Sequence, residues 1–127
     1  MESFAFLTPT VIRHYTTEAG LDQTAIEQLV ALAERIIAEP VLQRCAEQLF
    51  AQVYQRADVV IEPTVETLFG AEANKLYLLL AVNAVRQLHA VQQQRGIPEA
   101  IIQESYGALA MTARRFAAWH GGQTGVE

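Results

Sequence analysis

The chain has 127 residues and carries nine basic against fourteen acidic residues, which gives a formal net charge of −5. This length suits a single domain, and the acidic balance argues against a nucleic-acid binder. Hydrophobic residues make up 51% of the chain and charged residues 18%, which excludes a disordered polypeptide. The single cysteine, Cys45, excludes a disulfide framework and a four-cysteine zinc site.

The first third of the chain predicts two helices. Residues 8–16 are expected to form a short first helix. The second ends near Glu39, and its apolar residues recur every three or four positions, which is typical of one buried helix face. These positions are Ile26, Leu29, Val30, Ala33, Ile36 and Ile37. Either Asp22 or Thr24 can cap this helix, and Thr24 with Glu27 matches the pattern of a capping box.

The middle of the chain predicts a third helix and a connection. Pro40 ends the second helix and suits the first turn of the third, which we expect to extend to about Arg56. Its apolar stripe consists of Leu42, Cys45, Ala46, Leu49, Phe50 and Val53. Residues 59–61 are expected to be a connector that covers the core. Thr64 is expected to cap a short helix that stops at Gly70.

The segment 71–95 is the most informative, because it contains neither glycine nor proline and predicts a helix about 37 Å long. Residues 76–82 are apolar on every side of such a helix, which is typical of the middle of a bundle. Gly96 is a natural residue to end it, and Pro98 opens a last helix. The expected core face of that helix is Ile101, Ile102, Tyr106, Leu109, Ala113 and Phe116. The glycines at 121–122 are expected to end it.

These elements predict an all-α fold, a single compact helical bundle of about four to six helices with a long central apolar helix. We assign the bundle to residues 1–120 and a tail or linker to residues 121–127. The longest apolar run, residues 76–82, is far shorter than the roughly 20 residues that span a bilayer. The N-terminus has an acid where a secretory signal is basic, so a cytoplasmic protein without a membrane partner is expected.

Side chains that could carry catalysis are few, and each has a structural explanation. His89 has neither an acid nor a histidine at helical ligand spacing, and His14 with Glu18 is a typical surface pair. Cys45 lies on an apolar stripe, where a cysteine behaves as a small hydrophobe rather than a nucleophile. Ser105 is expected to bond to a backbone carbonyl. We therefore predict no catalytic, cofactor-binding or metal-binding residues.

Two groups of residues are nevertheless candidates for binding. Asn83 is a polar residue in an apolar segment, so if buried it needs hydrogen-bond partners, and it fixes helix register or meets a ligand. The candidate pocket residues are Asn83, His89 and Tyr106. The candidate interface residues mix cations and aromatics near the C-terminus, and they are Arg114, Arg115, Phe116 and Trp119. The alternative for the two arginines is a pair favoured by the C-terminal end of a helix.

A longer match lies in the second half of the chain. Residues 78–90 followed by Arg95-Gly96-Ile97-Pro98-Glu99 resemble the N-terminal helical domain of acyltransferase-domain-containing bacterial proteins. In that family a long apolar helix ends in such a Gly-Ile-Pro-Glu corner and a further helix follows. Longer members continue into a GNAT-like domain that supplies acyl-CoA binding. The resemblance implies that catalysis resides in that other domain, so no catalytic residue is carried over.

The predicted function is therefore a non-catalytic accessory or scaffold domain for an acyltransferase domain in cis or trans. Acyltransferase activity is expected only when the chain is joined to a GNAT-like domain. One alternative is a stand-alone homo-oligomeric helical protein with Arg114, Phe116 and Trp119 at a two-fold interface. Another is a small-molecule binder with a pocket between helices. No cofactor and no nucleic-acid partner are expected.

Overall fold

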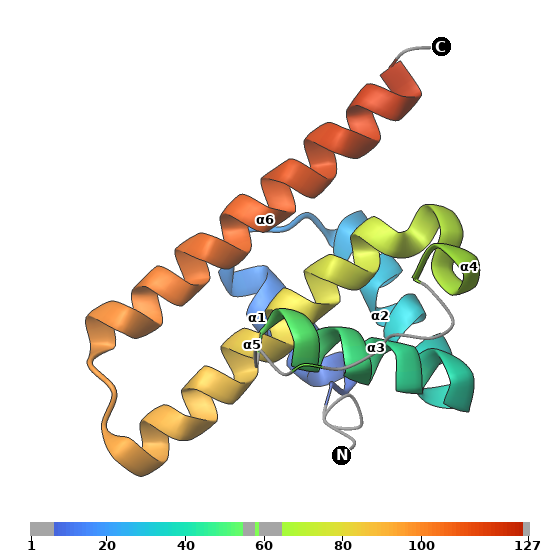
Figure 1. Cartoon of the computed structure of the whole chain (residues 1–127). Coiled ribbons are helices and arrows are strands. Elements are labelled where there is room, and N and C mark those ends of the chain that lie inside the picture. The colour runs from blue at the N-terminus through green and yellow to red at the C-terminus, as the bar shows by residue number, and fades with distance from the viewer. Residues whose placement is uncertain (1–6, 55–57, 59–64, 126–127) are drawn as a thin grey trace.

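The computed structural model of the chain describes residues 7–54, 58 and 65–125, with side chains as far as residue 115. Its helices, drawn in Figure 1, are α1 (Pro9–Glu18), α2 (Gln23–Ala38), α3 (Pro40–Val53), α4 (Val65–Phe69), α5 (Ala73–Arg95) and α6 (Glu99–Gly125). A 3-10 turn, η2 (Gly70–Glu72), joins α4 to α5. The described part of the chain contains no strand, so the fold is all-α, as the sequence predicts.

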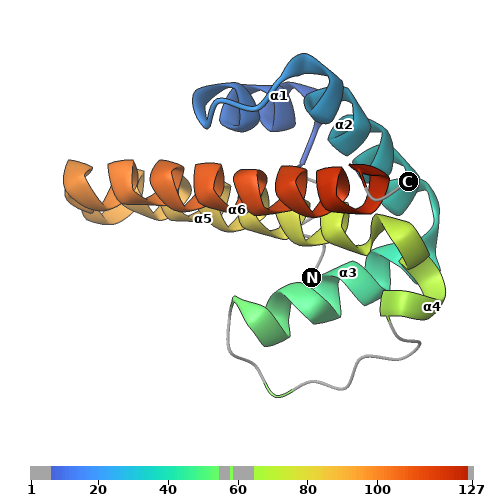
Figure 2. The same cartoon turned by 90° about the horizontal axis from the view of Figure 1, so that it is seen from above.

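The helices are arranged around α5. This helix contacts α1, α2, α3, α4 and α6, whereas α6 packs mainly against α5 and also contacts α1. Figure 2 shows α5 and α6 side by side, with α1 and α2 on one side of the pair and α3 on the other. Because α6 lies at the edge of this arrangement, much of its surface is uncovered in the described structure (Figure 1).

The first half of α5 forms the centre of the core. Five of its aliphatic side chains are completely buried, and they are Leu76, Leu78, Leu79, Leu80 and Val82. Their burial extends around most of the helix, because successive residues point about 100° apart. Tyr77 is 42% exposed, and burial on α5 stops at Val85, so the all-round burial belongs to the first half of the helix and not to its whole length. Each buried leucine contributes about 1.5–3 kcal/mol to folding.

Asp22 caps α2. Its backbone is extended, and its Oδ1 accepts a hydrogen bond from the backbone N–H of Ala25 at 2.8 Å. The helix therefore begins at Gln23, and Thr24 already lies inside its first turn. A capping box needs Thr24 outside the helix, so the prediction of a Thr24–Glu27 box is wrong, whereas the alternative of an Asp22 cap is confirmed.

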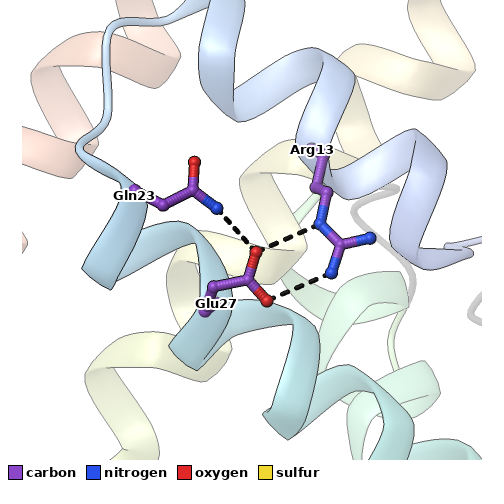
Figure 3. A network of polar contacts seen from close by, with 3 residues as sticks. All are labelled: Arg13, Gln23 and Glu27. Carbon is purple, nitrogen blue, oxygen red and sulfur yellow. Dashed lines mark hydrogen bonds and ion pairs between the residues drawn. The ribbon is translucent and has the colours of Figure 1, made fainter.

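Glu27 instead joins the first two helices (Figure 3). Its two carboxylate oxygens accept hydrogen bonds from Nε and Nη2 of Arg13 on α1, at 3.2 and 3.1 Å, and Oε2 also accepts one from Gln23 Nε2 at 2.7 Å. The hydrogen bond from Arg13 is the main reason that the pKa of Glu27 lies below its usual value. The two N–H donors of the Arg13 guanidinium fix the orientation of the Glu27 carboxylate. This ion pair adds little to the free energy of unfolding, because both side chains are exposed.

The corner between α5 and α6 follows the sequence prediction. Gly96 adopts the left-handed conformation, with φ of 67°, and its N–H donates to the carbonyl of Gln92 at 2.8 Å. On α6, Ile102 and Leu109 are buried against the bundle, but Ile101 is 44% exposed, so its assignment to the core face is wrong. The reason is that α6 is covered on one side only, and Ile101 points about 100° away from Ile102.

Several helix ends differ from the predicted ones. The third helix ends at Val53, before the predicted end. The last helix continues through the glycines at 121–122 to Gly125, since glycine costs only about 1 kcal/mol relative to alanine inside a helix. Residues 59–61 and Thr64 lie outside the described residues, and the division into bundle and tail stays a prediction. No described helix combines the length and the hydrophobicity needed to cross a bilayer.

The cap of α2 can be tested by substitution. Asp22→Ala is expected to lower the free energy of unfolding by about 1 kcal/mol, because the N–H of Ala25 loses its acceptor. Thr24→Ala is the matched control and should change it by less than about 0.5 kcal/mol. Urea denaturation followed by circular dichroism measures both. Equal losses in the two variants would contradict the assignment of the cap.

Candidate functional site

Four aromatic side chains meet where α1, α5 and α6 come together. The ring of His89 lies 5.1 Å from the rings of both Tyr15 and Tyr106, edge-on to each, and Tyr15 lies 4.9 Å from His14. We call these four residues the aromatic cluster. The Nε2 atom of His89 is buried, with no hydrogen-bond partner among the described residues. The structure thus brings together His89 and Tyr106, two of the three pocket candidates.

The sequence analysis missed the tyrosine at the centre of this cluster. Tyr15 is in ring contact with His14, His89 and Tyr106 and stacks on the last with centroids 6.1 Å apart. Its position three residues after the buried Ile12 is the signal that could have found it, because residues three apart share a helix face. His89 and Tyr106, which Tyr15 contacts, lie more than 70 positions away in sequence, so no local pattern predicts these contacts.

Burial and neighbouring charges set the protonation of the cluster. Burial lowers the pKa of His89, and the charge of protonated His14 lowers it further, while Glu99 opposes the shift. Burial also raises the pKa of both Tyr15 and Tyr106. At neutral pH the central rings are therefore uncharged, which suits their packing against one another.

Asn83, the third pocket candidate, has a different role in the described structure. It is completely buried, and its Oδ1 accepts a hydrogen bond from Nε of Arg86, one turn further along α5, at 3.0 Å. Burial lowers the pKa of Arg86, and the charges of Glu47 on α3 and, when it is ionised, Tyr15 on α1 oppose this shift. The expectation that a buried Asn83 needs a polar partner is confirmed. The bond orients a cation that interacts with helices on both sides of α5.

Two grooves open beside α6. The larger has a volume of about 380 Å³ and lies between the α1–α2 corner and the second half of α6; it is lined by Ala19, Gly20, Leu21, Asp22, Ala25, Ala110, Ala113 and Arg114. The smaller, of about 220 Å³, is lined by Tyr54, Ala81, Ala84, Val85, Leu88, Ser105, Ala108, Leu109 and Thr112. Asn83, His89 and Tyr106 line neither groove, so a pocket formed by these three stays a prediction.

The interface candidates all lie on α6. Arg114 and Arg115 are exposed, and Arg114 also lines the larger groove. The side chains of Phe116 and Trp119 lie outside the described part of the structure, although both residues belong to the helix. The two arginines therefore sit on an accessible surface, and their role in an interface stays a prediction.

The other side chains that could be reactive have structural roles in the described structure. Cys45 is buried, and burial raises the pKa of its thiol, which disfavours the nucleophilic thiolate. The hydroxyl of Ser105 donates to the carbonyl of Ile102 at 2.5 Å, as predicted. Over the residues that the structure describes, no three side chains among His, Cys, Asp and Glu are gathered as metal ligands. Cys45 and Ser105 therefore serve packing and local hydrogen bonding in the described structure.

The buried histidine makes a prediction about pH. The folded pKa of His89 lies below its unfolded value of about 6.5, so the folded state resists protonation and the unfolded state does not. Stability should be fully present above about pH 6.5 and decline as the pH falls from there toward the folded pKa. Thermal unfolding measured from pH 7.5 to 5.0 follows this decline in stability. His89→Gln removes the titrating imidazole and should make the decline smaller.

His14→Gln provides a second arm for the same measurement. Removing this charge raises the pKa of His89 and should also make the decline shallower. Glu34→Gln, an exposed substitution away from the cluster, serves as the control. A decline in His89→Gln as steep as in the unsubstituted chain would contradict the role of His89.

Comparison with known proteins identifies the family of this chain. No curated protein and no solved structure matches the chain. The sequence profile of the N-acyltransferase N-terminal domain does match, over residues 11–125. The match begins within α1 and continues to the end of α6, so it covers nearly all of the described bundle. The chain therefore belongs to the N-acyltransferase N-terminal domain family.

Proposed function

We propose that this chain is a non-catalytic helical module that docks a GNAT-like acyltransferase domain, in cis or in trans. The observation that carries the proposal is the family match over residues 11–125, since the family is defined as the N-terminal domain of N-acyltransferases. Acyl transfer then takes place in the docked domain, and the module acts in the cytoplasm as its support.

The described side chains support a module without chemistry of its own. Acyl transfer needs a positioned base or nucleophile near donors that stabilise an oxyanion. His89 is enclosed by tyrosine rings, Cys45 is buried with a raised thiol pKa, and Ser105 donates to a carbonyl of its own helix. Enclosure by aromatic rings, a raised thiol pKa and a hydroxyl bonded to its own helix each disfavour a role as base or nucleophile.

The larger groove is the docking surface that we assign to the transferase domain. Five of its eight lining residues are alanine or glycine, one more is Leu21, and Asp22 and Arg114 supply opposite charges at its walls. A concave apolar surface with a few charges is typical of a site that receives a partner's side chains. It includes the second half of α6, and the resemblance to acyltransferase-domain-containing proteins implies that a GNAT-like domain follows this helix in longer members.

The groove can be tested with the transferase domain of a longer family member or of a neighbouring gene. Purified module and transferase are expected to bind each other in isothermal titration calorimetry. Arg114→Glu reverses the exposed charge at the groove and should weaken binding by about tenfold, or 1.4 kcal/mol. Arg44→Glu on the exposed side of α3 is the matched control and should leave binding unchanged.

Acyl transfer measured alongside binding separates docking from catalysis. The module alone is expected to show no turnover of acyl-CoA, and the transferase should gain activity or thermal stability when the module is added. Turnover by the module alone would contradict the proposal. Absence of any association between the two purified proteins would also contradict it.

A second function, binding of a small molecule between helices, is favoured by one observation. The buried Nε2 of His89 has no described partner, and a ligand with a complementary polar group would supply one. If the aromatic cluster binds the acyl donor, acyl-CoA should raise the melting temperature of this chain. Differential scanning fluorimetry measures the shift, which Tyr106→Phe with His89→Gln should abolish. A flat response to acyl-CoA and free CoA would contradict this function.

A further inference from the structure

The outward side of α6 carries a regular stripe of exposed side chains. Its members are Ile101, Glu104, Ala108, Met111 and Arg115, and all five are exposed. Met111 is 52% exposed, and Ile101 is 44% exposed, as much as Val41 and Val53 elsewhere on the bundle. We call this surface the α6 outer stripe.

The stripe lies on the opposite side of α6 from the residues that pack against the bundle, and its member Ala108 also borders the smaller groove. Its members are spaced by three, four, three and four residues, which places them within about 80° of one another around the helix. Ile102 and Leu109, which pack against the bundle, point about 130° away from the middle of the stripe. Alternating three- and four-residue spacing is the pattern by which one helix packs along another. The stripe is therefore shaped to receive a helix.

The order of residues along the stripe indicates which helix it receives. Two copies of α6 can be placed antiparallel so that the numbers of any two facing residues add up to 219. In this register Glu104 faces Arg115 of the second copy. In the same register Ala108 faces Met111 of the second copy. The two-fold axis repeats each pair, so two ion pairs flank two contacts between a small and a large side chain. The stripe is thus complementary to itself in charge and in size.

A parallel arrangement lacks this complementarity. It would place Glu104 opposite Glu104 and Arg115 opposite Arg115, and like charges that face each other repel. It would also place the two Met111 side chains against each other and leave the alanines facing a gap. The charge order along the stripe therefore selects the antiparallel arrangement.

We propose that the α6 outer stripe binds a second copy of this chain, so that the protein forms a two-fold symmetric dimer through antiparallel α6 helices. The groove assigned to the transferase domain is lined by a different side of α6, at Ala110, Ala113 and Arg114. The dimer therefore goes beyond the proposed function and does not depend on it. Each α6 has 27 residues and is about 40 Å long, so antiparallel pairing directs the two C-terminal ends away from each other.

Charge reversal tests the proposal on the isolated chain. Sedimentation equilibrium is expected to give a mass that rises with concentration from 14.1 kDa to twice that value. Glu104→Arg places arginine opposite Arg115, and Arg115→Glu places glutamate opposite Glu104. Each single variant should raise the dissociation constant of the dimer by at least about tenfold, and the double variant should restore it.

Matched controls separate the stripe from a general effect of charge. Glu34→Arg on α2 and Arg44→Glu on α3 reverse exposed charges elsewhere and should leave the dissociation constant unchanged. Circular dichroism checks that every variant keeps its helix content, which is expected because both stripe positions are exposed. The rescue by the double variant cannot come from misfolding, since it carries both substitutions.

Three outcomes would overturn the proposal. The chain could stay a monomer up to a concentration of about 1 mM. The single variants could dimerise as well as the unsubstituted chain, or the double variant could fail to recover. If the chain is monomeric and Glu104→Arg weakens binding of the transferase domain, the stripe belongs to that domain and the dimer is rejected. The docking assignment of the groove is judged separately, by Arg114→Glu.

Discussion

The burial of the first half of α5 is the constraint on which the rest of the structure depends. Leu76 and Leu80 lie on one side of this helix and Leu78, Leu79 and Val82 on others, so aliphatic side chains on several sides must be shielded from water at once. One neighbouring helix cannot shield them all, which is why α1, α2 and α3 all gather around this segment. The second half of α5 is less apolar and extends from this centre, and there it carries His89 of the aromatic cluster.

This arrangement leaves α6 with two uses for its surface. The helix returns along α5 after Gly96 and buries Ile102 and Leu109, but α5 and α1 cover only one side of it. One flank forms a wall of the larger groove, and the outward side carries the stripe from Ile101 to Arg115. A long terminal helix that is only partly covered is an unfavourable way to build a stable monomer, because it exposes side chains such as Met111. The exposure becomes favourable when partners cover it.

The sequence predicted those features that depend on local chemistry. The apolar periodicity from Ile26 to Ile36, the proline that opens α3 and the glycine at 96 each act within one or two turns, and the structure has them as expected. Ile37, which the periodicity assigns to the same buried face, is 40% exposed, so that part of the prediction is wrong. The errors arose where two local solutions compete or where packing decides. Asp22 and Thr24 are equally good caps in sequence, and only the start of α2 distinguishes them. Ile101 is as apolar as its neighbour, and its exposure follows from which side of α6 meets α5. Tyr15 joins His89 across the bundle, a contact that no helical spacing encodes.

The proposed docking and self-association would account for a bundle of this kind that leaves its last helix so open. A domain that only had to fold would benefit from packing α6 more fully, since a half-exposed large apolar side chain forgoes about half of the roughly 1.5–3 kcal/mol that full burial contributes. Docking and self-association both require surface that the fold itself does not use. In the proposed dimer, antiparallel pairing of the outer stripes leaves the larger groove of each copy free. It also separates the C-terminal ends, so a transferase domain joined to each chain would lie at an opposite end of the dimer. The two assigned surfaces of α6 are therefore compatible with one assembly, in which the buried half of α5 fixes α6 in place and α6 positions the partners.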